Sequence, residues 1–62
     1  MTGKVKSWNR NSGWGFIKGM DGVDYFVHRN DIKGHSLPLN RVVVFDMEFT
    51  DKGAVARNVR YT

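Results

Sequence analysis

Apolar and polar residues alternate along most of this 62-residue chain, which is the two-residue period of strands that bury one face. The pattern predicts five strands and no long helix. The predicted strands cover residues 4–9, 14–18, 23–28, 41–50 and 54–61. Clusters of Gly, Asn, Ser and Asp lie between them and supply the chemistry of tight turns. The alternation is poorest over 54–61, so we expect a β-bulge in the last strand.

The longest connection, residues 29–40, lies between the third and fourth predicted strands. Asn30 and Asp31 are residue types that cap short helical turns, and a turn there would send Ile32 inward. Gly34 and Pro38 predict irregular backbone in the rest of this connection.

Five short strands separated by regular turns are typical of an all-β sandwich or barrel. In so short a chain we favour a closed, antiparallel five-stranded barrel, because closure removes the edges and builds a core from one layer of inward side chains. One domain is expected over residues 1–62. The predicted core is Val5, Ile17, Tyr25, Val27, Ile32, Val43, Phe45, Met47 and Val59.

The opposite faces of the first three strands carry many aromatic rings interleaved with lysines. Their side chains are Lys4, Lys6, Trp8, Trp14, Phe16, Lys18, Asp24, Phe26 and His28. An apolar patch on a small monomer usually marks a binding site. Rings among lysines suit single-stranded nucleic acid, because bases stack on the rings while cations meet phosphates. The net charge of +4 also favours an anionic partner. The alternative is that the faces are reversed, with these rings in the core.

Several segments resemble the cold-shock domain family. Residues 12–17, SGWGFI, are similar to its first ribonucleoprotein motif, and residues 25–29, YFVHR, are similar to its second. The opening GKVKSWN at 3–9 and the Asn58–Val59 pair match further family positions. The resemblance covers essentially the whole chain. It implies a Greek-key barrel of the OB-fold type that binds single-stranded RNA and DNA with low sequence preference, as RNA chaperones do in bacteria.

The resemblance also implies contact residues. It places Lys6 on a phosphate, Asp24 on base edges and Lys52 at a basic position of the last hairpin. The implied stacking residues are Trp8, Trp14, Phe16, Phe26 and His28.

Four departures from the family pattern stand out. Ser7 replaces a stacking tryptophan, Ser12 replaces a lysine, and residues 34–40 lack a phenylalanine unless His35 or Leu37 serves. Arg29 replaces a phenylalanine, and we expect its planar guanidinium to contact both a base and a phosphate.

Other chemistry is sparse. The absence of cysteine excludes disulfides and thiolate zinc sites and is compatible with a cytosolic location. His28 and His35, with Asp31 between them, are metal-ligand types, although a stacking His28 and a solvated His35 are the simpler interpretation. We expect no catalysis, cofactor, membrane or small-molecule substrate.

Two further charged groups lie in the last third of the chain. Asp46, Glu48 and Asp51 are predicted to be the solvated side of the fourth strand, without a partner cluster. Arg57 and Arg60 either extend the basic rim or keep the last strand soluble.

Two other functions remain open. The chain is compatible with an SH3-like barrel that binds a proline-rich peptide, or with a diverged cold-shock-like adaptor for a cellular protein. A monomer is expected, and a dimer formed by strand exchange stays possible.

Overall fold

The computed structural model describes residues 1–34 and 36–62. Its elements are β1 (Thr2–Asn9), β2 (Trp14–Gly19), β3 (Asp24–His28), the 3₁₀ turn η1 (Arg29–Asp31), β4 (Val42–Thr50) and β5 (Gly53–Tyr61). The predicted strands are confirmed, with ends that differ by at most two residues. The described residues contain no helix of the length and apolarity that a membrane crossing needs.

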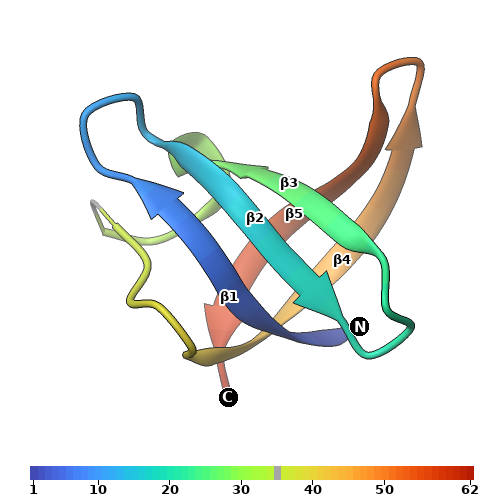
Figure 1. Ribbon diagram of the computed structural model, residues 1–62, viewed down its shortest axis with the longest axis horizontal. Coiled ribbons are helices and arrows are strands. Elements are labelled where there is room, and N and C mark those ends of the chain that lie inside the picture. The colour runs from blue at the N-terminus through green and yellow to red at the C-terminus, as the bar shows by residue number, and fades with distance from the viewer. Residues whose placement is uncertain (35) are drawn as a thin grey trace.

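The strands close into a ring in the order β1-β2-β3-β5-β4 (Figure 1). The first three strands form an antiparallel meander, and β4 pairs antiparallel with both β1 and β5. One pair departs from the antiparallel arrangement: β3 meets β5 in parallel, where Phe26 lies opposite Val55. The turn between β4 and β5 extends beyond the ring. The all-β, five-stranded closed barrel is confirmed.

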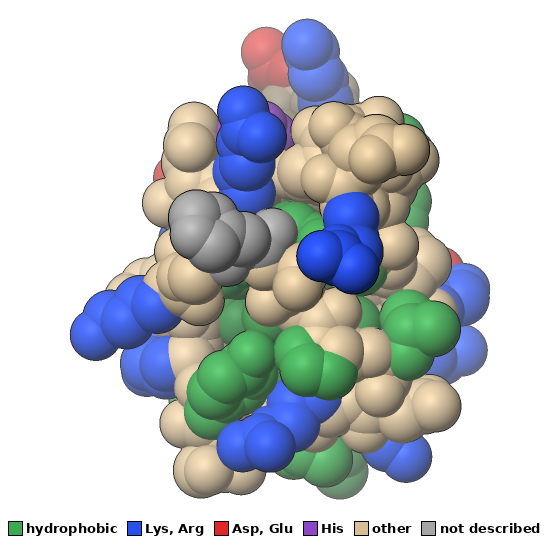
Figure 2. All heavy atoms as spheres, turned by 90° about the vertical axis from the view of Figure 1, so that its left-hand side faces the viewer, with side chains coloured by type: hydrophobic (Ala, Val, Ile, Leu, Met, Phe, Trp, Pro, Cys, Tyr) green, Lys and Arg blue, Asp and Glu red, His purple; other side chains and the backbone are tan. Residues whose placement is uncertain are grey.

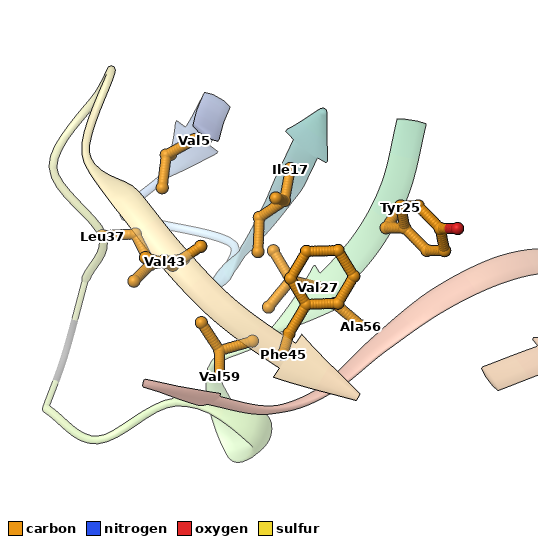
Figure 3. Close-up of a cluster of buried hydrophobic side chains, with 9 residues drawn as sticks. All are labelled: Val5, Ile17, Tyr25, Val27, Leu37, Val43, Phe45, Ala56 and Val59. Carbon is orange, nitrogen blue, oxygen red and sulfur yellow. The ribbon is translucent and has the colours of Figure 1, made fainter. Parts of the chain in front are cut away.

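The core lies inside this ring and is formed by side chains from all five strands (Figure 3). Its buried members are Val5, Ile17, Tyr25, Val27, Leu37, Val43, Phe45, Ala56 and Val59. Seven of the nine predicted core residues are therefore buried. Because Val5, Ile17 and Val27 are inside, the reversed assignment of the faces is wrong.

The two remaining core predictions need correction. Ile32 is only partly buried and packs against the edge of the core. Met47 is 49% exposed, because its part of β4 lies past the last residue that pairs with β1, Val44. Two buried residues were not predicted: Leu37 comes from the irregular connection, and Ala56 is a small side chain in the poorly alternating last strand.

A bulge in β1 changes which residues share a face. Val5 lies opposite Ile17, but Ser7 lies opposite Phe16, so β1 contains one residue more than β2 over this stretch. Trp8 then lies opposite Gly15 and packs partly against the core. Simple alternation had predicted Trp8 outside, beside the lysines, and that prediction is wrong.

The bulge expected in the last strand is confirmed at Asn58. Asp46 lies opposite Arg57 and Val44 opposite Arg60, which leaves two residues of β5 facing one of β4. Asn58 has a φ of 51°, in the left-handed region that asparagine tolerates better than most residues. The bulge restores an inward side chain at Val59.

The helical turn between β3 and β4 is also present, with a different cap. The Nδ1 atom of His28 accepts a hydrogen bond from the backbone N–H of Asn30 at 3.1 Å. The cap is therefore His28, two residues before Asn30 and three before Asp31, which were the predicted caps. Ile32 follows the turn and bridges to Val59, so η1 is held against β5.

Candidate nucleic-acid interface

The outer face of β1, β2 and β3 is organised in three cross-strand rows. Residues directly opposite each other on neighbouring strands project from the same face. The rows, read from β1 through β2 to β3, are Asn9–Trp14–His28, Ser7–Phe16–Phe26 and Lys4–Lys18–Asp24. The aromatic rows therefore lie next to a row of two lysines and one aspartate. We call this surface the ring face.

Three rings of this face contact one another. The ring centroids of Trp14 and Phe26 are 5.9 Å apart, those of Phe16 and Phe26 are 5.9 Å apart, and those of Trp14 and Phe16 are 6.1 Å apart. The two phenylalanines are half-buried and Trp14 is 39% exposed. Edge-to-face and tilted contacts of this kind hold rings in place while leaving part of each ring open to solvent.

An ion pair lies at one end of the ring face. The ammonium of Lys6 is 2.8 Å from Oδ2 of Asp24, and both side chains are about half exposed, at 53% and 41%. The hydrogen bond from Lys6, followed by the charges of Lys6 and Lys18, lowers the pKa of Asp24 below its ordinary value. Asp24 is thus ionised near neutral pH and bonded to the lysine predicted to contact phosphate.

A groove of about 730 Å³ runs between the ring face and the turn that joins β4 to β5. The ring face contributes Phe16, Asp24 and Phe26, and residues 50–55 form the opposite wall together with Arg57. Lys52 lines this groove, so the structure brings it next to the predicted stacking residues. The wall itself was not predictable from local patterns, because the pairing that brings β5 beside β3 joins residues far apart in the chain.

Arg29 lies beyond the last row of the ring face. Its backbone N–H donates to the carbonyl of Gly13 at 2.8 Å, and its aliphatic stem lies where a Gly13 side chain would project. Its guanidinium is anchored by no ion pair among the described residues. Neighbouring His28 is half-buried and faces the same way as Trp14.

Trp8 is the one predicted stacking residue that the structure separates from the others. It is half-buried, packs against the core and makes none of the ring contacts of the ring face. Its indole Nε1 is buried without a hydrogen-bond partner among the described residues. Ser7 occupies the position on the ring face that alternation had assigned to Trp8.

The arginines of β5 bind carboxylates of neighbouring elements. Arg57 contacts Glu48 at 2.8 Å and Asp31 at 2.9 Å, and Arg60 lies 3.6 Å from Asp46. Asp46 and Glu48 are exposed, as predicted for the solvated side of the fourth strand, and each also pairs with one of these arginines. Glu48, followed by Asp31, raises the pKa of Arg57, which stays charged.

Most of the positive charge is left unpaired by these contacts. Of the ten lysine and arginine side chains, three form ion pairs in the described part of the chain, and the other seven do not. The side of the barrel shown in Figure 2 carries Lys and Arg side chains over its whole height, whereas acidic atoms appear only at its margins. No group of three metal-ligating side chains occurs among the described residues, and His35 lies outside them.

Comparison with known proteins identifies the family. The model of the 'Cold-shock' DNA-binding domain matches residues 1–62. The chain belongs to the cold-shock domain family. It is 43% identical to cold shock protein 1 of Lactiplantibacillus plantarum, with 92% of this chain and 91% of that protein aligned. It is 42% identical to the cold shock-like protein CspE of Bacillus anthracis, over 95% and 92% of the two chains.

A third relative extends the match to the whole chain. The cold shock-like protein CspB of Escherichia coli is 41% identical over 100% of this chain and 93% of its own. The protein is therefore a nucleic-acid-binding cold-shock domain and not an enzyme. Its fold is the OB-type barrel that the resemblance of the two motifs implied.

The structure shows the consequences of two departures from the family pattern. Ser7 leaves the middle row of the ring face with two rings, Phe16 and Phe26. Leu37 is buried in the core at 4% exposure, so it does not supply the ring missing from residues 34–40. His35, the other candidate, lies outside the described residues.

Proposed function

We propose that this cold-shock domain binds single-stranded RNA or DNA on the ring face with low sequence preference, as an RNA chaperone or regulator. The observation that carries the proposal is the cluster of three partly open rings flanked by lysines. Stacking contributes about 1–3 kcal/mol per base and accepts any base, because every base has a π-face. Bases within a duplex are already stacked, so the ligand must be unpaired.

The proposed contacts divide by chemistry. Trp14, Phe16, Phe26 and His28 stack on bases, and Asp24 accepts hydrogen bonds from base edges. The proposed phosphate contacts are Lys6, Lys52 and Arg29, the last also lying over a base. Trp8 is left out of the stacking set because its ring packs against the core.

The test is a fluorescence titration with heptathymidylate and heptauridylate, compared with a duplex of the same length. The single strands should quench tryptophan emission and bind much more tightly than the duplex. Phe16→Ala and Phe26→Ala should each weaken binding by about 1–3 kcal/mol. Phe49→Ala is the matched control, because Phe49 is 68% exposed, lies on β4 and does not line the groove.

Charge should contribute separately from stacking. Lys52→Ala should flatten the salt dependence of single-strand affinity by about 0.7 log units per decade if one phosphate contact is lost. Equal affinity for duplex and single strand, or unchanged affinity in both phenylalanine variants, contradicts the proposal and favours a protein partner.

A further inference from the structure

The Lys6–Asp24 ion pair joins two residues with different proposed partners in the nucleic acid. Lys6 is proposed to contact a phosphate, and Asp24 is proposed to accept hydrogen bonds from a base edge. Asp24 is the only acidic residue of β1, β2 and β3, and it is the cross-strand partner of Lys18. Its carboxylate nevertheless holds Lys6 at 2.8 Å. A phosphate that binds Lys6 must therefore compete with a carboxylate already in place.

This competition for Lys6 differs between a strand that has bases and a polyanion that has only phosphates. A base stacked on Phe16 or Phe26 lies beside Asp24, because all three side chains line the same groove. Every natural base carries an N–H donor on its pairing edge, and an ionised carboxylate is an acceptor only. Such a base satisfies Asp24 when Lys6 moves to the phosphate, whereas a bare phosphate leaves Asp24 without a partner.

We propose that Asp24 couples base recognition to phosphate recognition: it holds Lys6 in the free protein and releases it when a base donates to the carboxylate. This inference rests on the proposed function. Its consequence is selectivity for strands with exposed bases over other polyanions. An exposed ion pair is weak, so the effect on affinity is about two- to fivefold.

The proposal is tested with two ligands of equal charge, heptathymidylate and a seven-unit abasic strand with the same phosphates, at low ionic strength. Asp24→Asn should bind the abasic strand about two- to fivefold more tightly than the parent does. The same variant should bind heptathymidylate no more tightly than the parent, because it loses an ionised acceptor. A gain for the abasic strand without a gain for heptathymidylate is the expected signature.

Asp46→Asn is the matched control for net charge. Asp46 is also an exposed, ion-paired aspartate, but its partner is Arg60 on β5, and it belongs neither to the rows of the ring face nor to the lining of the groove. Any gain common to both asparagine variants is a long-range charge effect. In a Lys6→Ala background, Asp24→Asn should give no gain beyond that of the control, since no lysine remains to be released.

Three results overturn the coupling. They are an abasic-strand gain equal to that of Asp46→Asn, a gain that persists without Lys6, and abasic binding that stays undetectable in Asp24→Asn. If heptathymidylate does not bind the parent protein, the proposed function fails as well. If it binds normally and the double-variant comparison shows no coupling, only this inference fails.

Discussion

Replacing Gly15 by alanine tests how the β1 bulge is accommodated. A methyl group there would overlap the carbonyl oxygen of Ser7 and lie 2.8 Å from the Cα atom of Trp8. Both neighbours are backbone atoms, so no side chain can rotate away. The clash is relieved only if β1 separates from β2 at the bulge, which strains or breaks ladder hydrogen bonds.

The expected loss is large for a domain of this size. Overpacking costs about 1–3 kcal/mol, and each lost hydrogen bond adds about 1 kcal/mol, so we expect about 3 kcal/mol. One core in so short a chain supplies only about 3–5 kcal/mol in total. At about 4–8 °C per kcal/mol, Gly15→Ala should lower the melting temperature by roughly 12–24 °C.

The measurement is urea and thermal unfolding followed by circular dichroism. Gly34→Ala is the control, because its methyl group would meet no atom within 4 Å and only the positive φ of 95° is strained. That variant should lose about 1 kcal/mol. A loss below about 1 kcal/mol in Gly15→Ala would show that the close approach of β1 to β2 is not required, and the account of Trp8 would fall with it.

Two further predictions concern aromatic residues. Trp8→Phe removes a buried indole N–H that has no partner among the described residues, so stability should change little and heptathymidylate should still quench the remaining emission. Trp14→Phe should abolish most of the quenching, and the reverse result would place Trp8 on the ring face. Tyr25→Phe removes the hydroxyl that donates to Asp21 at 2.6 Å. In the parent protein this hydrogen bond is the main reason that the pKa of Asp21 lies below its ordinary value. A lowered pKa stabilises the fold above the ordinary pKa of the carboxyl, and this stability is lost as pH falls from that value through the lowered pKa of the folded state. Tyr25→Phe should therefore melt earlier at neutral pH and show a weaker loss of stability below about pH 4, measured by thermal unfolding across pH; an unchanged pH profile would show that this bond contributes nothing.

The strands and most of the core were predictable because alternation reports directly which residues are buried. Val5, Ile17 and Val27 follow the two-residue period within short, regular strands. The bulge in β1 was not predictable in this way, since an added residue inverts every later position of a strand. Gly15 carried the available signal: a glycine between two large aromatics indicates a neighbouring backbone that leaves no room for a side chain.

The ring face was predictable to the same extent as its strands. Trp14, Phe16 and Phe26 lie where the pattern put them, because β2 and β3 pair without a bulge. The groove wall at residues 50–55 and the binding of Lys6 to Asp24 depend on how distant strands meet. Those features come from the closure of the ring, which no local pattern describes.

The pairing of Arg57 and Arg60 with carboxylates has a consequence for association rates. These contacts neutralise acids of β4 and η1 locally, while Lys4, Lys18 and Lys52, which form no ion pair in the described part of the chain, lie beside the rings. The resulting field is uneven, and uneven fields orient a charged partner before contact. A polyanion should thus arrive with the ring face in front of it. Its association rate should fall steeply with ionic strength while its dissociation, limited by stacking, changes less.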